Sequence, residues 1–101
     1  MKNEGDVKKA VKKILLKFDD KLWYFMPAAN GYGRAGVPDF VGNLNGHFFA
    51  IETKFGSNDL TANQVKEVQN IIATGGQVWI VRDTSLDVFS HEFAAWAALC
   101  S

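Results

Sequence analysis

The spacing of apolar residues predicts an amphipathic helix at the start of the chain, over residues 3–18. Apolar side chains recur there at intervals of three or four positions, Val7 and Val11 among them, and lysines occupy the other face. Residues 22–26 are largely aromatic and strand-like, and Pro27 closes this run. The chain is therefore expected to open with a helix followed by a strand.

Two apolar-rich runs further along, residues 37–44 and 47–55, flank the dipeptide Asn45-Gly46. Both central residues of a type I′ turn need a positive φ, so Asn-Gly in this context predicts a β-hairpin with a two-residue loop. The glycine-rich stretch before the hairpin, residues 28–36, is expected to be a loop.

The second half of the chain alternates between helix and strand. Residues 60–74 carry an apolar stripe behind a candidate N-cap, Thr61, and Gly75-Gly76 ends this helix. Residues 77–82 are typical of a buried strand, and residues 86–99 are typical of a last helix.

These elements predict one α/β domain over residues 1–101. A strand–helix–strand connection must cross over the sheet, so the last strand is expected to pair in parallel, whereas the hairpin is antiparallel. The order helix, three strands, helix, strand and C-terminal helix gives a mixed sheet flanked by helices.

The hairpin register brings candidate chemistry together. If Leu44 pairs with His47, Asp39 falls directly opposite Glu52. Directly opposed side chains lie about 4.5–5.5 Å apart at Cβ, and like charges there destabilise a hairpin. Lys54 is two residues beyond Glu52 and shares its face. A fold that keeps both acids usually has a cation between them, so the pattern predicts a divalent metal site beside an ammonium group.

Such a site suits phosphodiester cleavage. Mg²⁺ takes oxygen ligands and keeps several waters, so one or two carboxylates and a substrate phosphate suffice, and the carbonyl of Thr53 could add a ligand. The ammonium of Lys54 could orient water and offset charge in the transition state. Pro38-Asp39 alone is a common turn, and Glu52-x-Lys54 alone is often a surface ion pair. The prediction rests on their joint placement.

Composition restricts the setting of the protein. The formal net charge is zero, which is mild evidence against a nucleic-acid protein, but lysines crowd the first predicted helix, where a phosphate backbone would meet a local positive charge. The chain has one cysteine and no signal-type or membrane-spanning apolar stretch. These features predict an intracellular, cytoplasmic protein without a membrane segment.

With these residues the chain resembles the PD-(D/E)XK nuclease superfamily, whose restriction-endonuclease-like core has the same α-β-β-β-α-β order. More narrowly, it resembles stand-alone, phage-type members of the VRR-NUC (virus-type replication-repair nuclease) family. The residues that carry the resemblance are Arg34, Gly36, Pro38-Asp39, Glu52-Thr53-Lys54 and Leu60-Thr61-x-x-Gln64.

The resemblance implies roles for the residues that match. Asp39, Glu52 and the carbonyl of Thr53 would hold Mg²⁺ or Mn²⁺. Lys54 would be the catalytic lysine, and Gln64 would face the site from the next helix.

The resemblance also implies an acid early in the first helix that helps to hold the metal. Glu4 matches, because Val7, Val11 and Ile14 follow it at the expected helical offsets. Asp6 is the competing choice.

The implied function is metal-dependent endonucleolytic hydrolysis of DNA. The implied substrates are branched or four-way junction DNA, or a duplex that is nicked. The implied enzyme is a homodimer and is virus-encoded. The alternatives are a catalytically inactive nucleic-acid-binding or dimerisation module on the same fold, and a structural α/β protein whose acids pair with lysines.

Contacts to DNA are expected from the first helix and the glycine-rich loop. Lys8, Lys9 and Lys12 would hold the backbone, with Arg34 and Tyr32 from the loop. A solvated helix face and an ordinary connector are about equally good interpretations of these two segments.

The last helix is unusually apolar, and we expect it both to cover the sheet and to join a partner through a set of large side chains. These are Phe89, Phe93, Trp96 and Leu99. Neither His47 nor His91 neighbours the carboxylates in sequence, so neither is expected to be a metal ligand.

Overall fold

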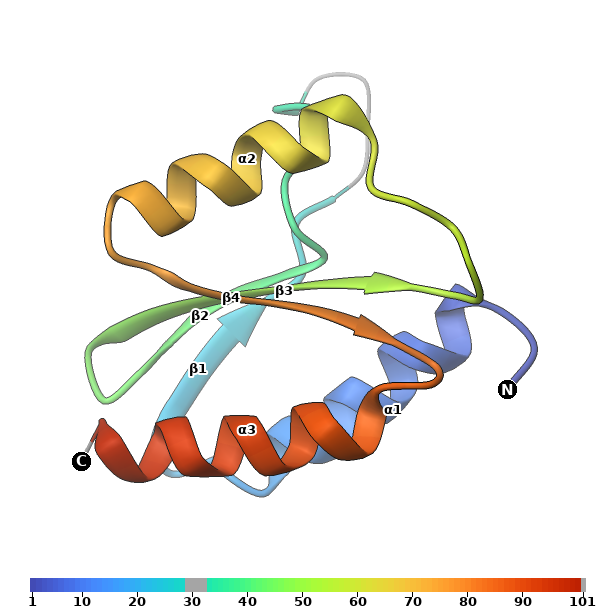
Figure 1. Ribbon diagram of the computed structural model, residues 1–101. Helices are drawn as coiled ribbons and strands as arrows, with labels where there is room; N and C mark the ends of the chain where they lie inside the picture. The colour runs from blue at the N-terminus through green and yellow to red at the C-terminus, as the bar shows by residue number, and fades with distance from the viewer. Residues whose placement is uncertain (29–32, 101) are drawn as a thin grey trace.

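The structure of the protein is a computed structural model that describes residues 1–28 and 33–100 (Figure 1). Its helices within these residues are α1 (Glu4–Leu16), α2 (Ala62–Ala73) and α3 (Leu86–Leu99). Its strands are β1 (Leu22–Phe25), β2 (Phe40–Leu44), β3 (His47–Lys54) and β4 (Gln77–Arg82). The predicted α/β class and the predicted order of elements are confirmed.

The strands form one mixed sheet in the order β1-β2-β3-β4. β1, β2 and β3 pair antiparallel, and β3 and β4 pair in parallel, as the crossover through α2 predicts. Figure 1 shows α1 and α3 on one side of the sheet and α2 on the other. The sheet is therefore the middle of three layers.

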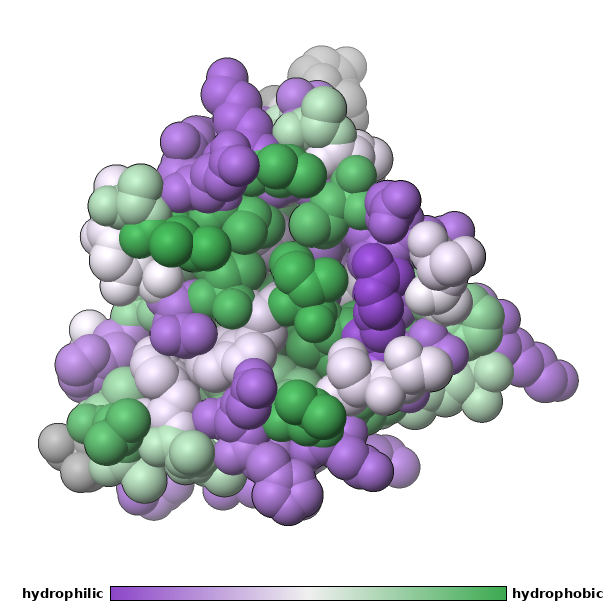
Figure 2. All heavy atoms as spheres, viewed as in Figure 1, coloured by the Kyte–Doolittle hydropathy of each residue, from purple (hydrophilic) through white to green (hydrophobic). Residues whose placement is uncertain are grey.

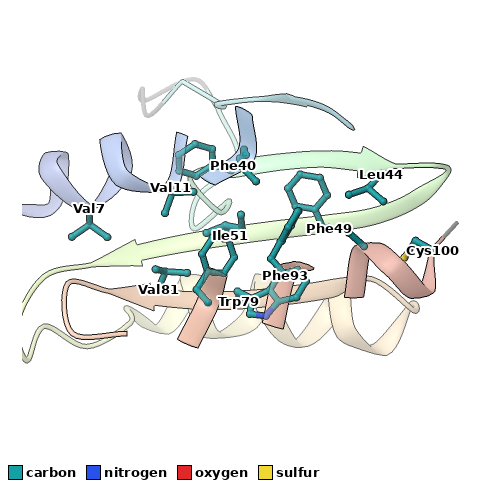
Figure 3. Close-up of a cluster of buried hydrophobic side chains, with 13 residues drawn as sticks. Val7, Val11, Phe40, Leu44, Phe49, Ile51, Trp79, Val81, Phe93 and Cys100 are labelled. Atoms are coloured by element: carbon teal, nitrogen blue, oxygen red, sulfur yellow. The ribbon is translucent and has the colours of Figure 1, made fainter. Parts of the chain in front are cut away.

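The hydrophobic core lies between the sheet and helices α1 and α3 (Figure 3). Val7, Val11 and Leu15 recur about one helical turn apart on α1, and all three are fully buried. Phe93 of α3 packs edge to face on Phe49 of β3, with ring centroids 5.4 Å apart. The apolar faces of both helices thus cover one face of the sheet. The other face carries α2 and polar side chains.

Most of the large apolar side chains of α3 serve the core of the protein itself. Phe89 and Phe93 are buried and Trp96 is half-buried, whereas Leu99 is 85% exposed. The expectation that this helix covers the sheet is confirmed, and of these four side chains only Leu99 is largely exposed. None of the helices in the described part of the chain has the length and hydropathy to cross a membrane.

The β2–β3 hairpin has the predicted two-residue turn and register. Asn45 and Gly46 both have positive φ, 50° and 88°, and Leu44 pairs with His47. A one-residue slip would have moved every side chain to the other face, so this turn determines which residues of β3 face the core.

β2 begins at Phe40, later than the predicted start at residue 37. Pro38 has no N–H to donate to a strand ladder. The N–H of Asp39 donates to the side chain of Glu52, at 3.1 Å to Oε1, and not to the backbone of β3. The chain therefore leaves the regular sheet just before Phe40, at the point where the acidic residues meet.

The second face of the sheet carries polar and exposed aromatic side chains. Because side chains alternate along a strand, Glu52 and Lys54 point away from the core-facing Ile51. α2 packs over β4 on this face, and none of its 12 residues is buried. At the opposite edge of the sheet, Trp23 and Phe25 of β1 are 62% and 48% exposed. This face is thus only partly covered.

Candidate active site

Glu52 lies at the centre of the site, on β3 between two neighbouring strands. Only 2% of Glu52 and 8% of Lys54 are exposed, and Lys54 Nζ lies 3.9 Å from Glu52 Oε2. Burying charged groups costs free energy, and pairing them offsets only part of that cost. The interpretation of these two residues as an ordinary surface ion pair is therefore wrong.

Asp39 meets β3 from the point where β2 ends. Its Oδ2 accepts hydrogen bonds from the backbone N–H of Thr53 at 2.9 Å and from Thr53 Oγ1 at 2.6 Å. The Thr53 side chain points to the face opposite that of Glu52. The carboxylate of Asp39 therefore lies beside the edge of β3, whereas a regular hairpin would have placed it squarely above the Glu52 face. The two acids are adjacent, as predicted, but they approach β3 from different directions.

The carbonyl of Thr53 is directed toward the same edge. In a strand, the N–H and C=O of one residue point to the same neighbour. Because the Thr53 N–H donates to Asp39, the Thr53 carbonyl also faces the side where Asp39 lies. One backbone oxygen and the Asp39 carboxylate therefore share this edge of β3.

Gln64 joins the start of α2 to Glu52. Its Oε1 accepts a hydrogen bond from the N–H of Thr61, and its backbone N–H donates to Thr61 Oγ1, which completes a capping box. Its Nε2 donates to Glu52 Oε2 at 2.7 Å. The Thr61-x-x-Gln64 pattern therefore caps the helix and orients the buried carboxylate with one side chain.

The environment of Glu52 favours its neutral form. Burial, followed by the charge of Asp39 and a hydrogen bond with its side chain, raises the pKa of Glu52 from the ordinary 4.5 to about 8, and the ammonium of Lys54 opposes this shift. Strongly shifted carboxylates gather at functional sites more often than elsewhere. A cation held beside Glu52 would favour its ionised form.

Lys8 connects α1 to the site, a position that the sequence pattern did not reveal. Its Nζ lies 3.7 Å from Asp39 Oδ1 and 3.7 Å from Glu4 Oε2. Asp6, the competing acid, instead accepts a hydrogen bond from the N–H of Lys2 at 2.7 Å. Glu4 is thus the acid that shares an ammonium with Asp39, and Asp6 is engaged at the N-terminal end of the chain.

The residues predicted to contact DNA lie in different parts of the structure. Lys9 and Lys12 are exposed on α1. Arg34 forms a two-point ion pair with Glu67 of α2, at 2.6 Å from Nε to Oε2 and 2.9 Å from Nη2 to Oε1, and sequence reasoning had not identified Glu67. Tyr32 lies outside the described residues.

The donor set can be tested for its fit to a divalent cation. Among residues 1–28 and 33–100, no three His, Cys, Asp or Glu side chains are grouped closely enough to form a metal site by themselves. Two carboxylates and a backbone carbonyl nevertheless suit Mg²⁺, which prefers oxygen and keeps several waters. Asp39, Glu52 and Thr53 could therefore hold such a cation together with a substrate phosphate.

Comparisons with known proteins bear on the fold. No family model matches the sequence, and no curated protein matches it. Among solved structures, the chain is similar to a VRR_NUC domain, with a TM-score of 0.69 and 22% identity over 85% of this chain and 91% of that one. It is also similar to Archaeoglobus fulgidus Hjc, a Holliday junction resolvase, with a TM-score of 0.51 and 19% identity over 74% of this chain and 66% of that one. The resemblance inferred from the sequence is confirmed at the level of the fold.

Proposed function

We propose that the protein is a metal-dependent endonuclease that hydrolyses phosphodiester bonds of DNA. One observation carries this proposal: the buried carboxylate of Glu52 has both the acid Asp39 and the ammonium of Lys54 beside it. A structural protein gains nothing from burying this group of ionisable side chains, because apolar residues of similar size are often at least as stabilising. The fold shared with a VRR_NUC domain and with a Holliday junction resolvase supports the same reaction class.

Each residue has a proposed task. Asp39, Glu52 and the Thr53 carbonyl hold Mg²⁺ or Mn²⁺, and Gln64 and Thr53 fix the two carboxylates. When bound, the cation supplies Lewis-acid polarisation of the scissile phosphate and lowers the pKa of water that attacks it. Lys54 orients that water and stabilises negative charge as the phosphorus is attacked.

Two residues of α1 complete the proposed site. Glu4 would contribute through water; its carboxylate and that of Asp39 each lie 3.7 Å from the ammonium of Lys8. Lys8 offsets the charge of Asp39 and is near enough to meet the scissile phosphate.

The proposed substrate is branched DNA, or a duplex of which the enzyme nicks one strand. The test is a comparison of cleavage of four end-labelled substrates: blunt duplex, single strand, flapped duplex and four-way junction. Preferred cutting of the flap or junction supports structure specificity, and equal cutting of all four argues against it. Tight binding of every substrate without cutting in Mg²⁺ or Mn²⁺ identifies the alternative, an inactive DNA-binding module.

Exposed lysines of α1 should supply part of the DNA affinity. We expect the double substitution Lys9→Gln and Lys12→Gln to weaken duplex binding and to reduce the slope of log K against log salt by about 0.9 for each phosphate that the variant no longer neutralises. Binding measured by fluorescence anisotropy from low to moderate salt checks this. Lys17→Gln, at the far end of α1 from Glu4, is the matched control. If the slope is the same in the double variant as in the wild type, Lys9 and Lys12 do not contact DNA and only form a solvated helix face.

A homodimer is the proposed assembly, because cutting two strands needs two sites and two-fold symmetry supplies them. Exposed apolar surface gathers between α2 and β4 (Figure 2), and on α2 Val65 and Ile72 are 39% and 57% exposed. We therefore assign the contact to α2, because the aromatic side chains of α3 pack into the core. Light scattering should give twice the 11.2 kDa of one chain, and Ile72→Asp should give the monomer mass. A monomeric wild-type protein at micromolar concentration contradicts the assignment.

A further inference from the structure

The edge strand β1 carries two exposed aromatic side chains that the proposed chemistry does not use. Trp23 and Phe25 alternate with the core-facing Tyr24 along β1, so both point to the face that carries Glu52. Trp23 is 62% and Phe25 is 48% exposed. Contiguous exposed apolar patches on folded proteins often mark binding sites, whereas single exposed apolar side chains are ordinary.

The register places this pair close to the acids. Phe25 pairs with Val41 on β2, two residues along the strand from Asp39. In a regular sheet this offset corresponds to about 8 Å at Cα. Asp39 follows at that position, just outside β2. Trp23 lies two residues further along β1, so the aromatic pair leads directly away from the site.

The two rings form a surface and not a slot. Their centroids are 5.6 Å apart with the planes tilted by 45°, so they pack on one another. A base inserted between them would need about 6.8 Å, two stacking distances of about 3.4 Å. A flat ligand therefore stacks on the outer faces of the rings. Phe48, 46% exposed, lies on the same transverse row as Trp23, with Asn43 between them, and extends the surface across the sheet.

We infer that Trp23 and Phe25 form a stacking surface for unpaired nucleobases next to the scissile phosphate. The inference rests on the proposed function and names its substrate class: DNA with a single-stranded segment at the cut. Bases stack on aromatic side chains whatever their sequence, whereas paired bases in a duplex present no free face. A second copy of the chain fits the surface less well, because a partner seated on β1 at the end where β2 leads to Asp39 would obstruct a phosphodiester at the acids.

Tryptophan fluorescence in EDTA tests the inference without cleavage. Trp23 is well exposed, whereas Trp79 is buried and Trp96 is half-buried, so stacking should quench Trp23 most. We expect oligo-dT to quench the wild-type protein and to leave Trp23→Phe nearly unquenched, although phenylalanine can still stack. Equal quenching of both proteins overturns the inference.

Affinities give the second arm of the test. We expect Trp23→Ala combined with Phe25→Ala to weaken binding of oligo-dT and of a flapped duplex by about 5- to 100-fold for each base that no longer stacks, and to change blunt-duplex binding by less than about two-fold. Val88→Ala, 58% exposed on α3 at the other side of the sheet, is the control and should change none of these affinities. Circular dichroism confirms that the double variant is folded.

The outcomes separate this inference from the proposed function. If the wild-type protein cuts DNA and the double variant keeps its affinity for single strands, the stacking surface is wrong and the nuclease proposal stands. If oligo-dT quenches Trp23 but no substrate is ever cut, the nuclease proposal fails and the stacking surface stands. If the double substitution halves the molar mass in solution and leaves the affinities unchanged, the surface joins two copies of the chain, and the inference is overturned.

Discussion

Asp39→Ala, Glu52→Ala and Lys54→Ala are each expected to abolish detectable DNA cleavage in Mg²⁺. Removing one electrostatic contributor from a preorganised site commonly costs about 10²- to 10³-fold in rate, and loss of a metal ligand should cost at least as much. Asp39 and Glu52 would hold the proposed cation, and Lys54 is buried beside them with its ammonium 3.9 Å from Glu52. Initial rates on an end-labelled four-way junction, with equal amounts of each folded variant, measure these losses.

Asp39→Asn is the matched control for this series. Asp39→Ala removes a carboxylate that accepts two hydrogen bonds from Thr53, each worth about 1.5–3 kcal/mol because the acceptor is charged. Asparagine keeps an oxygen for Thr53 and removes only the charge. Asp39→Asn should therefore retain the stability of the wild-type protein and still lose cleavage. Wild-type rates from both Asp39→Asn and Glu52→Ala would show that the site is elsewhere.

The stability of the metal-free protein should fall as pH rises from about 5 to 8, because the pKa of Glu52 is raised to about 8 in the folded chain. Between the ordinary value of 4.5 and this value, the folded protein holds a proton that the unfolded chain has released. The free energy of unfolding contributed by Glu52 is fully present below the lower value and is lost through this window, at up to about 1.4 kcal/mol per pH unit.

Urea unfolding in EDTA at several pH values measures this slope. Glu52→Gln should remove most of it, because glutamine imitates the protonated acid and can still accept a hydrogen bond from Gln64. Asp59→Asn, an exposed carboxylate outside the site, is the control and should leave the slope unchanged. Mg²⁺ should stabilise the wild-type protein more at pH 8 than at pH 5, because its ligands must be ionised. The same pH dependence in the wild-type protein and in Glu52→Gln would contradict this account.

Local chemistry explains why the hairpin could be predicted from the sequence. Asn45-Gly46 supplies the two positive φ angles of a type I′ turn, and the two-residue loop fixes the pairing of Leu44 with His47. The start of β2 could not be predicted as well. The pattern continued to residue 37, but Pro38 lacks a donor and the Asp39 N–H bonds to a side chain 13 positions away.

Long-range geometry explains what the sequence did not reveal about the site. The adjacency of Asp39 and Glu52 followed from register alone, and the capping pattern at Thr61 indicated that Gln64 opens a helix. The direction from which Asp39 approaches β3, the contact of Lys8 with Asp39 and the pairing of Arg34 with Glu67 all depend on how helices cross the sheet. Local periodicity specifies which face of a helix is buried, but not where its ends lie over the sheet.

The measurement that tests the central claim most directly is cleavage of an end-labelled four-way junction by the wild-type protein in Mg²⁺ or Mn²⁺ and in EDTA. We predict discrete products with either cation, no products in EDTA, and recovery of cleavage when excess cation is added back. The Lys54→Ala protein measured alongside should bind the junction and leave it intact, which excludes a contaminating nuclease. A junction that is bound by the wild-type protein and remains uncut with both cations would contradict the proposal that Asp39, Glu52 and Lys54 form a nuclease site.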